Sequence, residues 1–151
     1  MWCSRMERQG GGMSRIYISA PRSMRAEAET LAGLIEAAVP GAVVSPRWWT
    51  DIPNGDDRDM PEAEAMAIAQ EQAIAVLSSD VLVYLSSPRG DGQGTHTELG
   101  LALAGQHLQG APVVIGVGAH VAQSIFNRLT TKWVGNWDAA VDAVRDGWGE
   151  W

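Results

Sequence analysis

A glutamate in a glycine-rich turn is the residue of this sequence with the clearest chemical potential. Glu98 follows Gly90, Gly92 and Gly94, and these glycines follow a short apolar segment at residues 81–85 that has the composition of a buried strand. A carboxylate in the first turn of a helix is kept ionised by the helix dipole and by nearby backbone N–H groups. Glu98 could therefore face a glycine-walled cavity as a nucleophile or as an ion-pair partner.

The same glutamate also fits a purely structural role. In the pattern Thr95-x-x-Glu98, the threonine side chain would cap the backbone N–H of Glu98, and the glutamate side chain would return to the N–H of Thr95. One glutamate can fill both roles in different states, so both interpretations stay open on the sequence alone.

Serine and arginine side chains follow two of the predicted strands, where they could hold an anion. Ser19 and Arg22 come at the end of the first strand, and Ser87 comes at the end of the third. Phosphate groups bind to backbone N–H groups at helix starts and to side chains of these types beside them. The alternative for Arg22 is an ordinary solvated charge, which is the role of most surface arginines.

The order of the predicted elements would bring these residues together. Short β-rich segments are expected at residues 16–19, 42–45, 81–85, 112–117 and 132–134. Helical patterns alternate with them at residues 23–39, 61–77, 95–109, 119–128 and 137–146. This alternation predicts an α/β fold: a five-stranded parallel sheet in the order 2-1-3-4-5, with helices on both faces. The first and third strands flank the topological switch point, so their exits should meet at one cleft.

Length and composition indicate one domain that acts on small molecules. The chain has 151 residues, 46% of them hydrophobic, which is enough for a real core. Residues 1–13 are interpreted as a flexible leader and residues 14–151 as the domain. The formal net charge of −7 argues against a nucleic-acid surface. The single cysteine, Cys3, fits a reducing cytoplasm, and the sequence has neither a signal peptide nor an apolar run that could span a membrane.

Three segments of the chain resemble one enzyme family, and the third is the tail with Ile125-Phe-Asn-Arg-Leu, Trp133 and Asn136-Trp-Asp-Ala-Ala. The run Gly94-Thr-His-Thr-Glu98-Leu-Gly-Leu-Ala, preceded by Ser79-Asp80-Val-Leu-Val, is similar to the core motif of the nucleoside 2-deoxyribosyltransferases and of their relatives that hydrolyse deoxynucleoside 5'-monophosphates. The run Arg15-Ile-Tyr-Ile-Ser-Ala-Pro21 resembles the family's first strand. The resemblance extends over roughly residues 15–145, and it implies a single Rossmann/flavodoxin-like domain.

The resemblance also implies an activity and roles for several residues. Glu98 would attack C1' of a deoxyribosyl group and form a covalent intermediate, and Tyr17 would orient Glu98 or touch the sugar. The alternative for Tyr17 is a strand aromatic that fills the sheet face. Cleavage of an N-glycosidic bond generates oxocarbenium character at C1', which a carboxylate can trap or stabilise. Gly94 would line the substrate site.

One position departs from the family pattern. Alignment on Asp80 places Gln72 where the family has an aspartate that protonates the departing base. A glutamine can hydrogen-bond to a base edge but cannot act as an acid. Base protonation would then fall to Glu71, Asp91, His96 or water, or the activity would be weak or altered.

Three further expectations concern binding and assembly. Asp91 lies near the position of a base-contacting aspartate of the family. Asn127 resembles a residue that reaches the site from an adjacent subunit, which implies a homo-oligomer. Trp48 and Trp49, in a predicted loop, could close over a base or form a subunit contact.

Other polar residues are assigned no chemistry. Asp80 is expected to pin the start of the third strand. The histidines are isolated from other metal-binding side chains, so no metal and no other cofactor is expected.

Three classes of function remain. The first is an enzyme that cleaves or transfers the N-glycosidic bond of a 2'-deoxynucleoside or its 5'-monophosphate. The second is a non-catalytic nucleotide-binding or sensing module on the same fold, and a structural protein that offers its tryptophans to partners is a third possibility. In both of the first two cases the ligand is a small nucleoside or nucleotide, and neither nucleic acid nor a membrane is a partner.

Overall fold

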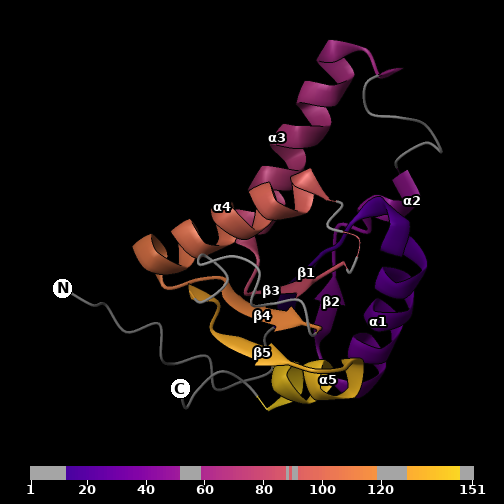
Figure 1. Ribbon diagram of the computed structural model, residues 1–151. Coiled ribbons are helices and arrows are strands. Elements are labelled where there is room, and N and C mark those ends of the chain that lie inside the picture. Colours follow the sequence, from indigo (N-terminus) through magenta and orange to yellow (C-terminus); the bar gives the residue numbers. More distant parts are fainter. Residues whose placement is uncertain (1–12, 52–58, 88, 90–91, 119–128, 147–151) are drawn as a thin grey trace.

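The computed structural model describes residues 13–51, 59–87, 89, 92–118 and 129–146. A five-stranded parallel sheet forms its centre in the order β2-β1-β3-β4-β5, which confirms the predicted α/β fold class and strand order (Figure 1). The strands are β1 (Ser14–Ser19), β2 (Ala42–Val44), β3 (Val81–Leu85), β4 (Val113–Val117) and β5 (Lys132–Val134).

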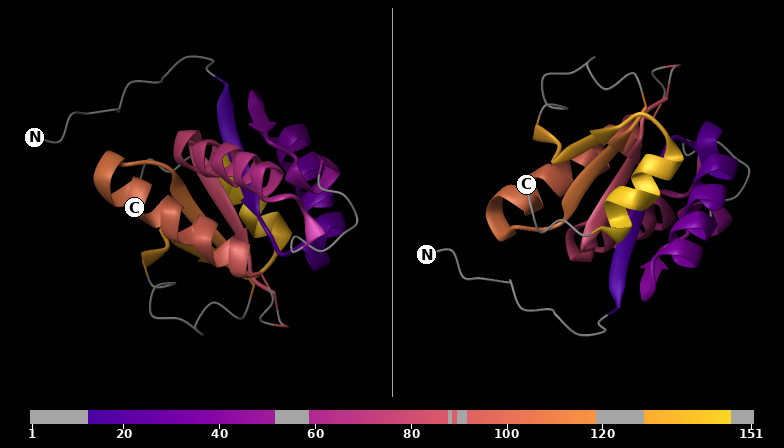
Figure 2. Two further views of the ribbon diagram at one scale, coloured as in Figure 1. Left: turned by 90° about the horizontal axis from the view of Figure 1, so that it is seen from above. Right: turned by 90° about the horizontal axis from the view of Figure 1, so that it is seen from below.

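Helices cover both faces of the sheet, as the alternating pattern predicted. They are α1 (Arg25–Ala38), α2 (Trp48–Asp51), α3 (Glu62–Ser78), α4 (Gln93–Gln109) and α5 (Trp137–Arg145). One face carries α3 and α4, and the other carries α1 and α5, as the two opposite views in Figure 2 show. The amino-terminal half of α3 projects beyond the sheet (Figure 1).

The central strands are apolar because both of their faces are covered. All five residues of β3 are buried, and β1 is buried from Ile16 to Ser19. In the register of this pair, Tyr17 lies beside Leu82 and Ser19 lies beside Tyr84. Because successive side chains of a strand point to opposite faces, these four residues share one face of the sheet, the face that α4 covers.

A polar contact fixes the amino end of the same strand pair. The Asp80 carboxylate accepts a hydrogen bond from the Arg15 backbone N–H at 2.9 Å. This contact is the structural role that the sequence predicted for Asp80. It links the start of β1 to the start of β3.

Trp133 and Gly116 pack together on the α4 side of the sheet. These residues lie side by side in the pairing of β4 with β5. A Cβ atom on Gly116 would stand 2.0 Å from Cζ3 of Trp133, so only glycine leaves room for the indole. The indole also meets the Tyr84 ring edge-on, with the ring centres 6.0 Å apart.

Three segments differ from the sequence-based expectation. The first helix was expected from Ser23, but a 3-10 turn (Arg22–Met24) precedes α1. The segment after β2 was predicted to be a loop, but it contains the short helix α2. Residues 1–12 of the leader expected at residues 1–13, and the helix expected at residues 119–128, lie outside the described residues. Of the helices described, none is both long and apolar enough to cross a membrane.

Candidate active site

Two side chains of β1 hold the carboxylate of Glu98. The Tyr17 hydroxyl donates a hydrogen bond to Oε1 at 2.5 Å, and the Ser19 hydroxyl donates one to Oε2 at 2.5 Å. The two donors stand on alternate residues of one strand and so point to the same face, where the first turns of α4 present Glu98. Each carboxylate oxygen accepts one short, charge-assisted bond and keeps a free lone pair.

The predicted capping box does not form. Helix α4 begins at Gln93, so Thr95 lies inside the helix and Gly92, with φ of 100°, occupies the N-cap position. No side chain caps this end of the helix. Both oxygens of Glu98 are engaged by β1, and the local interpretation of Thr95-x-x-Glu98 is therefore wrong.

Burial sets the protonation of the cluster. Removal from water raises the pKa of Glu98 above the usual 4.5, although the hydrogen bonds from Ser19 and Tyr17 oppose this rise. The pKa of Tyr17 is also raised, first by burial and then by the negative charge and hydrogen bonding of Glu98. Tyr17 therefore keeps its proton and remains a donor to the carboxylate.

A cavity of about 360 Å³ opens beside this cluster. It lies at the carboxyl end of β1, between α2, α3 and the start of α4, where open α/β sheets bind their ligands. Its size lies within the range of small-molecule pockets, about 300–1,000 Å³. Its walls include Arg22, Trp48, Gln72, Gly94 and Glu98.

Four residues predicted to form the site line this one cavity: Arg22, Gln72, Gly94 and Glu98. Tyr17 and Ser19 reach it through their bonds to the carboxylate of Glu98. Ser87 is not part of the lining, and its hydroxyl accepts a hydrogen bond from the Arg89 backbone N–H. Asp91 and Asn127 lie outside the described residues.

The two glycines at the start of α4 differ in what they require. A side chain on Gly92 would have to adopt a positive φ and would come within 2.8 Å of Thr95 Oγ1. A Cβ atom on Gly94 would meet no atom within 4 Å. The space in front of Gly94 is thus open, and it belongs to the cavity.

The tryptophans of α2 are packed into the core and are not exposed on a loop. Trp48 and Trp49 are both buried, and their rings meet edge-on. The Trp48 Nε1 donates to the Ile18 carbonyl at 2.8 Å, and the Trp49 Nε1 donates to Glu29 Oε2 at 2.5 Å. Trp48 therefore forms a fixed wall of the cavity, whereas Trp49 faces α1.

Sequence reasoning expected the exits of β1 and β3 at this cleft, but it did not single out Ala20, Pro21 and Gln93 as lining residues. The signal that could have found Gln93 is Gly92, because glycine is modestly enriched at the N-cap position of helices. Pro21 follows β1 after one residue, Ala20, so its position at the strand exit was itself an available signal.

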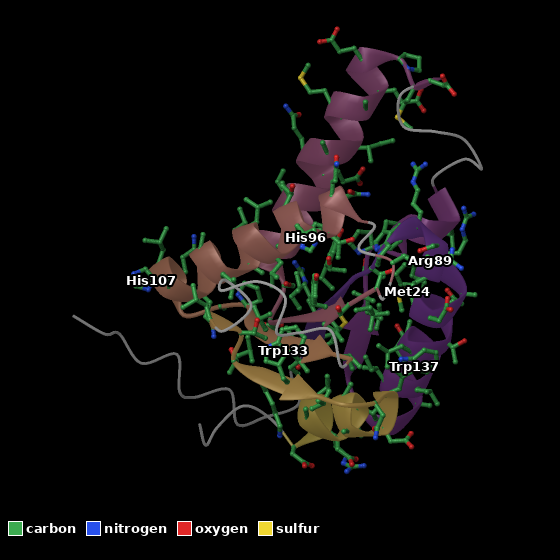
Figure 3. The ribbon with its side chains drawn as sticks, viewed as in Figure 1. Met24, Arg89, His96, His107, Trp133 and Trp137 are labelled. Atoms are coloured by element: carbon green, nitrogen blue, oxygen red, sulfur yellow. The ribbon has the colours of Figure 1, made fainter. Side chains whose placement is uncertain are left out.

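The two histidines that the structure describes do not form a metal site with other described residues. His96 and His107 stand at opposite ends of α4 (Figure 3). The His96 Nδ1 lies 3.4 Å from the Tyr84 hydroxyl. Among the described residues, no group of three or more histidine, cysteine or acidic side chains is placed to hold a metal ion.

A second hollow, of about 500 Å³, lies on the other face of the sheet between α1 and α5. Met24 and Trp137, which Figure 3 labels, contribute to its walls together with Leu34 and Val117. Asp138, at the start of α5, is the acidic residue among its described walls.

Comparison with known proteins gives similarity in structure alone. No protein-family model and no curated protein matches the sequence. A conserved protein from Enterococcus faecalis has 18% identity and a TM-score of 0.64, covering 89% of this chain and 98% of its own. A 2-deoxyribosyltransferase from Bacillus psychrosaccharolyticus has 13% identity and a TM-score of 0.65, covering 86% and 92%.

A third solved structure is a CMP N-glycosidase from Clostridium botulinum, with 14% identity and a TM-score of 0.52, covering 85% of this chain and 96% of its own. At these identities the similarity is one of fold. The chain therefore has the α/β architecture of solved 2-deoxyribosyltransferase and N-glycosidase structures over most of its length.

Proposed function

We propose that the protein is an enzyme that cleaves or transfers the N-glycosidic bond of a 2'-deoxynucleoside or its 5'-monophosphate, with Glu98 as the nucleophile. One observation carries the proposal: a partly buried carboxylate, held through both oxygens by Tyr17 and Ser19, lines a ligand-sized cavity at the switch point of the sheet. The similarity in fold to a 2-deoxyribosyltransferase and a CMP N-glycosidase supports this choice of reaction.

The reaction would proceed in two displacement steps. As the bond between C1' and the base nitrogen stretches, positive charge develops at C1', and an oxygen of Glu98 closes on it to form a glycosyl ester. In the second step, water or another base attacks C1' and the carboxylate of Glu98 leaves. Hydrolysis and transfer differ only in this second nucleophile.

Tyr17 and Ser19 would act as positioning residues. Their hydrogen bonds favour the ionised form of Glu98 against the cost of its burial. They also restrict the carboxylate to one orientation, which reduces the entropy lost on reaching the transition state.

Arg22 and the start of α4 would bind the far end of the substrate. Arg22 lines the cavity beside Gly94 and Thr95, whose backbone N–H groups belong to the first turn of α4. A helix start together with an arginine suits a 5'-phosphate. Ser87 is proposed as a second polar contact at the end of β3, and Asp91 and Asn127 as contacts from segments outside the described residues.

The proposed assembly is a homo-oligomer. Of the seventeen residues of α3, Val76 is the buried one, while Met66 and Ile74 are exposed. A second copy of the chain that packs along α3 would cover this apolar surface. The molar mass in solution, measured by light scattering across a dilution series, tests this assembly.

The direct test is product analysis. The protein is incubated with the four 2'-deoxynucleosides and their 5'-monophosphates, with and without a second free base, and the products are separated by chromatography. Free base alone indicates hydrolysis, and a new nucleoside indicates transfer. Glu98→Gln should abolish the product, whereas Glu71→Gln, which changes an exposed carboxylate on α3, should leave it unchanged.

Two results would overturn the proposal. One is equal turnover by the wild type and the Glu98→Gln variant. The other is the absence of any product together with a rise in melting temperature on addition of a nucleotide, which is the behaviour of a sensing module.

A further inference from the structure

The described part of the cavity wall contains the proposed nucleophile, Glu98, but no second carboxylic acid that could protonate a leaving group. Glu98 is the one carboxylic acid of that lining, and Arg22 is its one cationic side chain. The residue that α3 contributes to the wall is Gln72, whose carboxamide can donate and accept hydrogen bonds but has no proton to release. Among the described side chains of this wall, Glu98 can thus attack a sugar, but Gln72 cannot protonate what leaves it.

This combination restricts the leaving group. When the bond from C1' to the nitrogen of a neutral base breaks, the electron pair stays on the base, which departs as an anion unless an acid protonates it. A heterocycle that already carries a positive charge departs as a neutral molecule, so it needs no acid.

Resting on the function proposed above, we propose that the preferred substrates of this site are N-glycosides of a cationic heterocycle, such as an N-alkylated purine or a pyridinium. The juxtaposition that carries the inference is that Glu98 and the carboxamide of Gln72 line the same cavity, together with Trp48.

The charges balance without a proton in the first step. An oxygen of Glu98 forms a bond to C1', the bond from C1' to nitrogen breaks, and its electron pair neutralises the ring. A carboxylate and a cation thereby become a neutral ester and a neutral base. In the second step the water oxygen bonds to C1', the ester bond to Glu98 breaks, and the released carboxylate takes up the water proton before passing it to solvent.

Two further features of the cavity suit a cationic ring. The indole of Trp48 is fixed in the wall by its bond to the Ile18 carbonyl, and the face of a tryptophan attracts cations. Burial disfavours the ionised form of Glu98 and raises its pKa, and a cation entering the cavity would favour ionisation again. A cationic substrate would therefore help to generate the nucleophile that it needs.

A matched pair of substrates tests the inference on the wild-type protein. 2'-Deoxyguanosine and 7-methyl-2'-deoxyguanosine differ by one methyl group and one positive charge on the base. Base release is followed by chromatography, and each rate is divided by the rate in buffer, because the methylated nucleoside also decays unaided. We expect the acceleration to be about 100-fold larger for the methylated nucleoside, which is the lower range of what a general acid contributes.

A substitution in α3 gives the converse test. Gln72→Glu places an acid in the wall and should raise the rate with 2'-deoxyguanosine by about 100-fold, so that the preference for the methylated nucleoside over 2'-deoxyguanosine falls. Gln70→Glu adds the same charge on the exposed surface of α3 and should change neither rate. The melting temperature of each variant verifies that it is folded.

The outcomes separate this inference from the proposed function. Equal acceleration of the two nucleosides by the wild type, abolished in both cases by Glu98→Gln, would overturn the preference for a cation and leave the proposed function intact. Cleavage of neither these nucleosides nor any other 2'-deoxynucleoside or 5'-monophosphate would overturn both.

Discussion

The two faces of the sheet are packed in different ways. On one face, α5 buries four of its nine residues, Ala140, Val141, Ala143 and Val144, against the sheet and α1. On the other face, α3 buries one of its seventeen residues, Val76. The α1 and α5 face therefore contributes more apolar burial per helical residue. The α3 and α4 face buries less apolar surface per helical residue, and it carries the polar cluster of Tyr17, Ser19 and Glu98.

The two hollows repeat this contrast. The larger one, between α1 and α5, is lined mainly by apolar side chains such as Leu34 and Val117. The smaller one contains a carboxylate whose two oxygens are both hydrogen-bonded. Volume thus does not single out the candidate site, whereas a partly buried carboxylate with two hydrogen-bond donors does.

The largest expected effect distinguishes the acidic residues of the two hollows. Glu98→Gln should lower turnover by at least about 10³-fold, because an amide cannot form the glycosyl ester. Asp138→Asn, in the larger hollow, should leave turnover within about twofold. Steady-state kinetics on the substrate identified by product analysis measures both, and a comparable loss in the two variants would contradict the assignment.

The pH dependence of stability in the wild type and in Glu98→Gln tests the burial of Glu98. Because the folded-state pKa of Glu98 lies above its unfolded value, the unfolded chain loses this proton first as the pH rises. The contribution of Glu98 to the free energy of unfolding therefore falls between the unfolded and folded pKa values and stays low at neutral pH. The melting temperature of Glu98→Gln minus that of the wild type should therefore be larger at neutral pH than below the usual pKa of a glutamate.

The second prediction compares two tyrosines on neighbouring strands. Tyr17→Phe removes a hydrogen bond to a charged group and should lower turnover by about 10- to 100-fold. It should also raise the pKa of Glu98 further, moving the acidic limb of the pH–rate profile to higher pH. Tyr84→Phe keeps the ring beside Trp133 and should change turnover less than about threefold. An unmoved acidic limb in Tyr17→Phe would show that the bond does not control ionisation.

The third prediction concerns stability on the two faces. Val144→Ala removes two methyl groups from a side chain that is 3% exposed and should cost about 2 kcal/mol of unfolding free energy. Ile74→Ala changes a side chain of α3 that is 67% exposed and should cost less than about 0.5 kcal/mol. Urea unfolding at protein concentrations low enough to keep the chain monomeric measures both. Equal costs would remove the contrast between the faces.

The smallest effect separates two glycines of α4. A Cβ atom would meet no atom within 4 Å at Gly94 or at Gly100, so alanine at either position should stabilise the helix by up to about 1 kcal/mol. Only Gly94→Ala places its methyl group in the cavity, and it should raise KM about tenfold while Gly100→Ala leaves KM unchanged. Equal KM values in the two variants would show that substrate does not approach Gly94.

The parts of the fold that were predictable depend on short apolar segments. The run at β3 and the helical patterns around it indicated both the strand order and the meeting of the β1 and β3 exits. Tyr17, Ser19 and Glu98 could be placed near one another because topology alone brings these exits together. The partner atoms of each hydrogen bond could not be predicted in this way.

The failures share a physical cause, namely interactions between residues far apart in the chain. The capping box was a local pattern, but Tyr17 competes for Glu98 from 81 residues away. Helix α2 was taken for a loop because its tryptophans are fixed by the Ile18 carbonyl and by Glu29, which a local pattern cannot reveal. The start of α4 at Gln93 depends on the positive φ of Gly92, which only the surrounding turn determines.

The contact of Trp133 with Gly116 has a consequence for how the sheet is assembled. Strand β5 is a three-residue edge strand, and so short a ladder specifies its own alignment weakly. A slip by one residue would turn the indole to the opposite face and set it beside Ile115 or Val117, where a branched side chain takes the place of the glycine. Because Gly116 has no side chain, β5 can pair in the register that places Trp133 beside it, whereas the neighbouring registers leave no room for the indole.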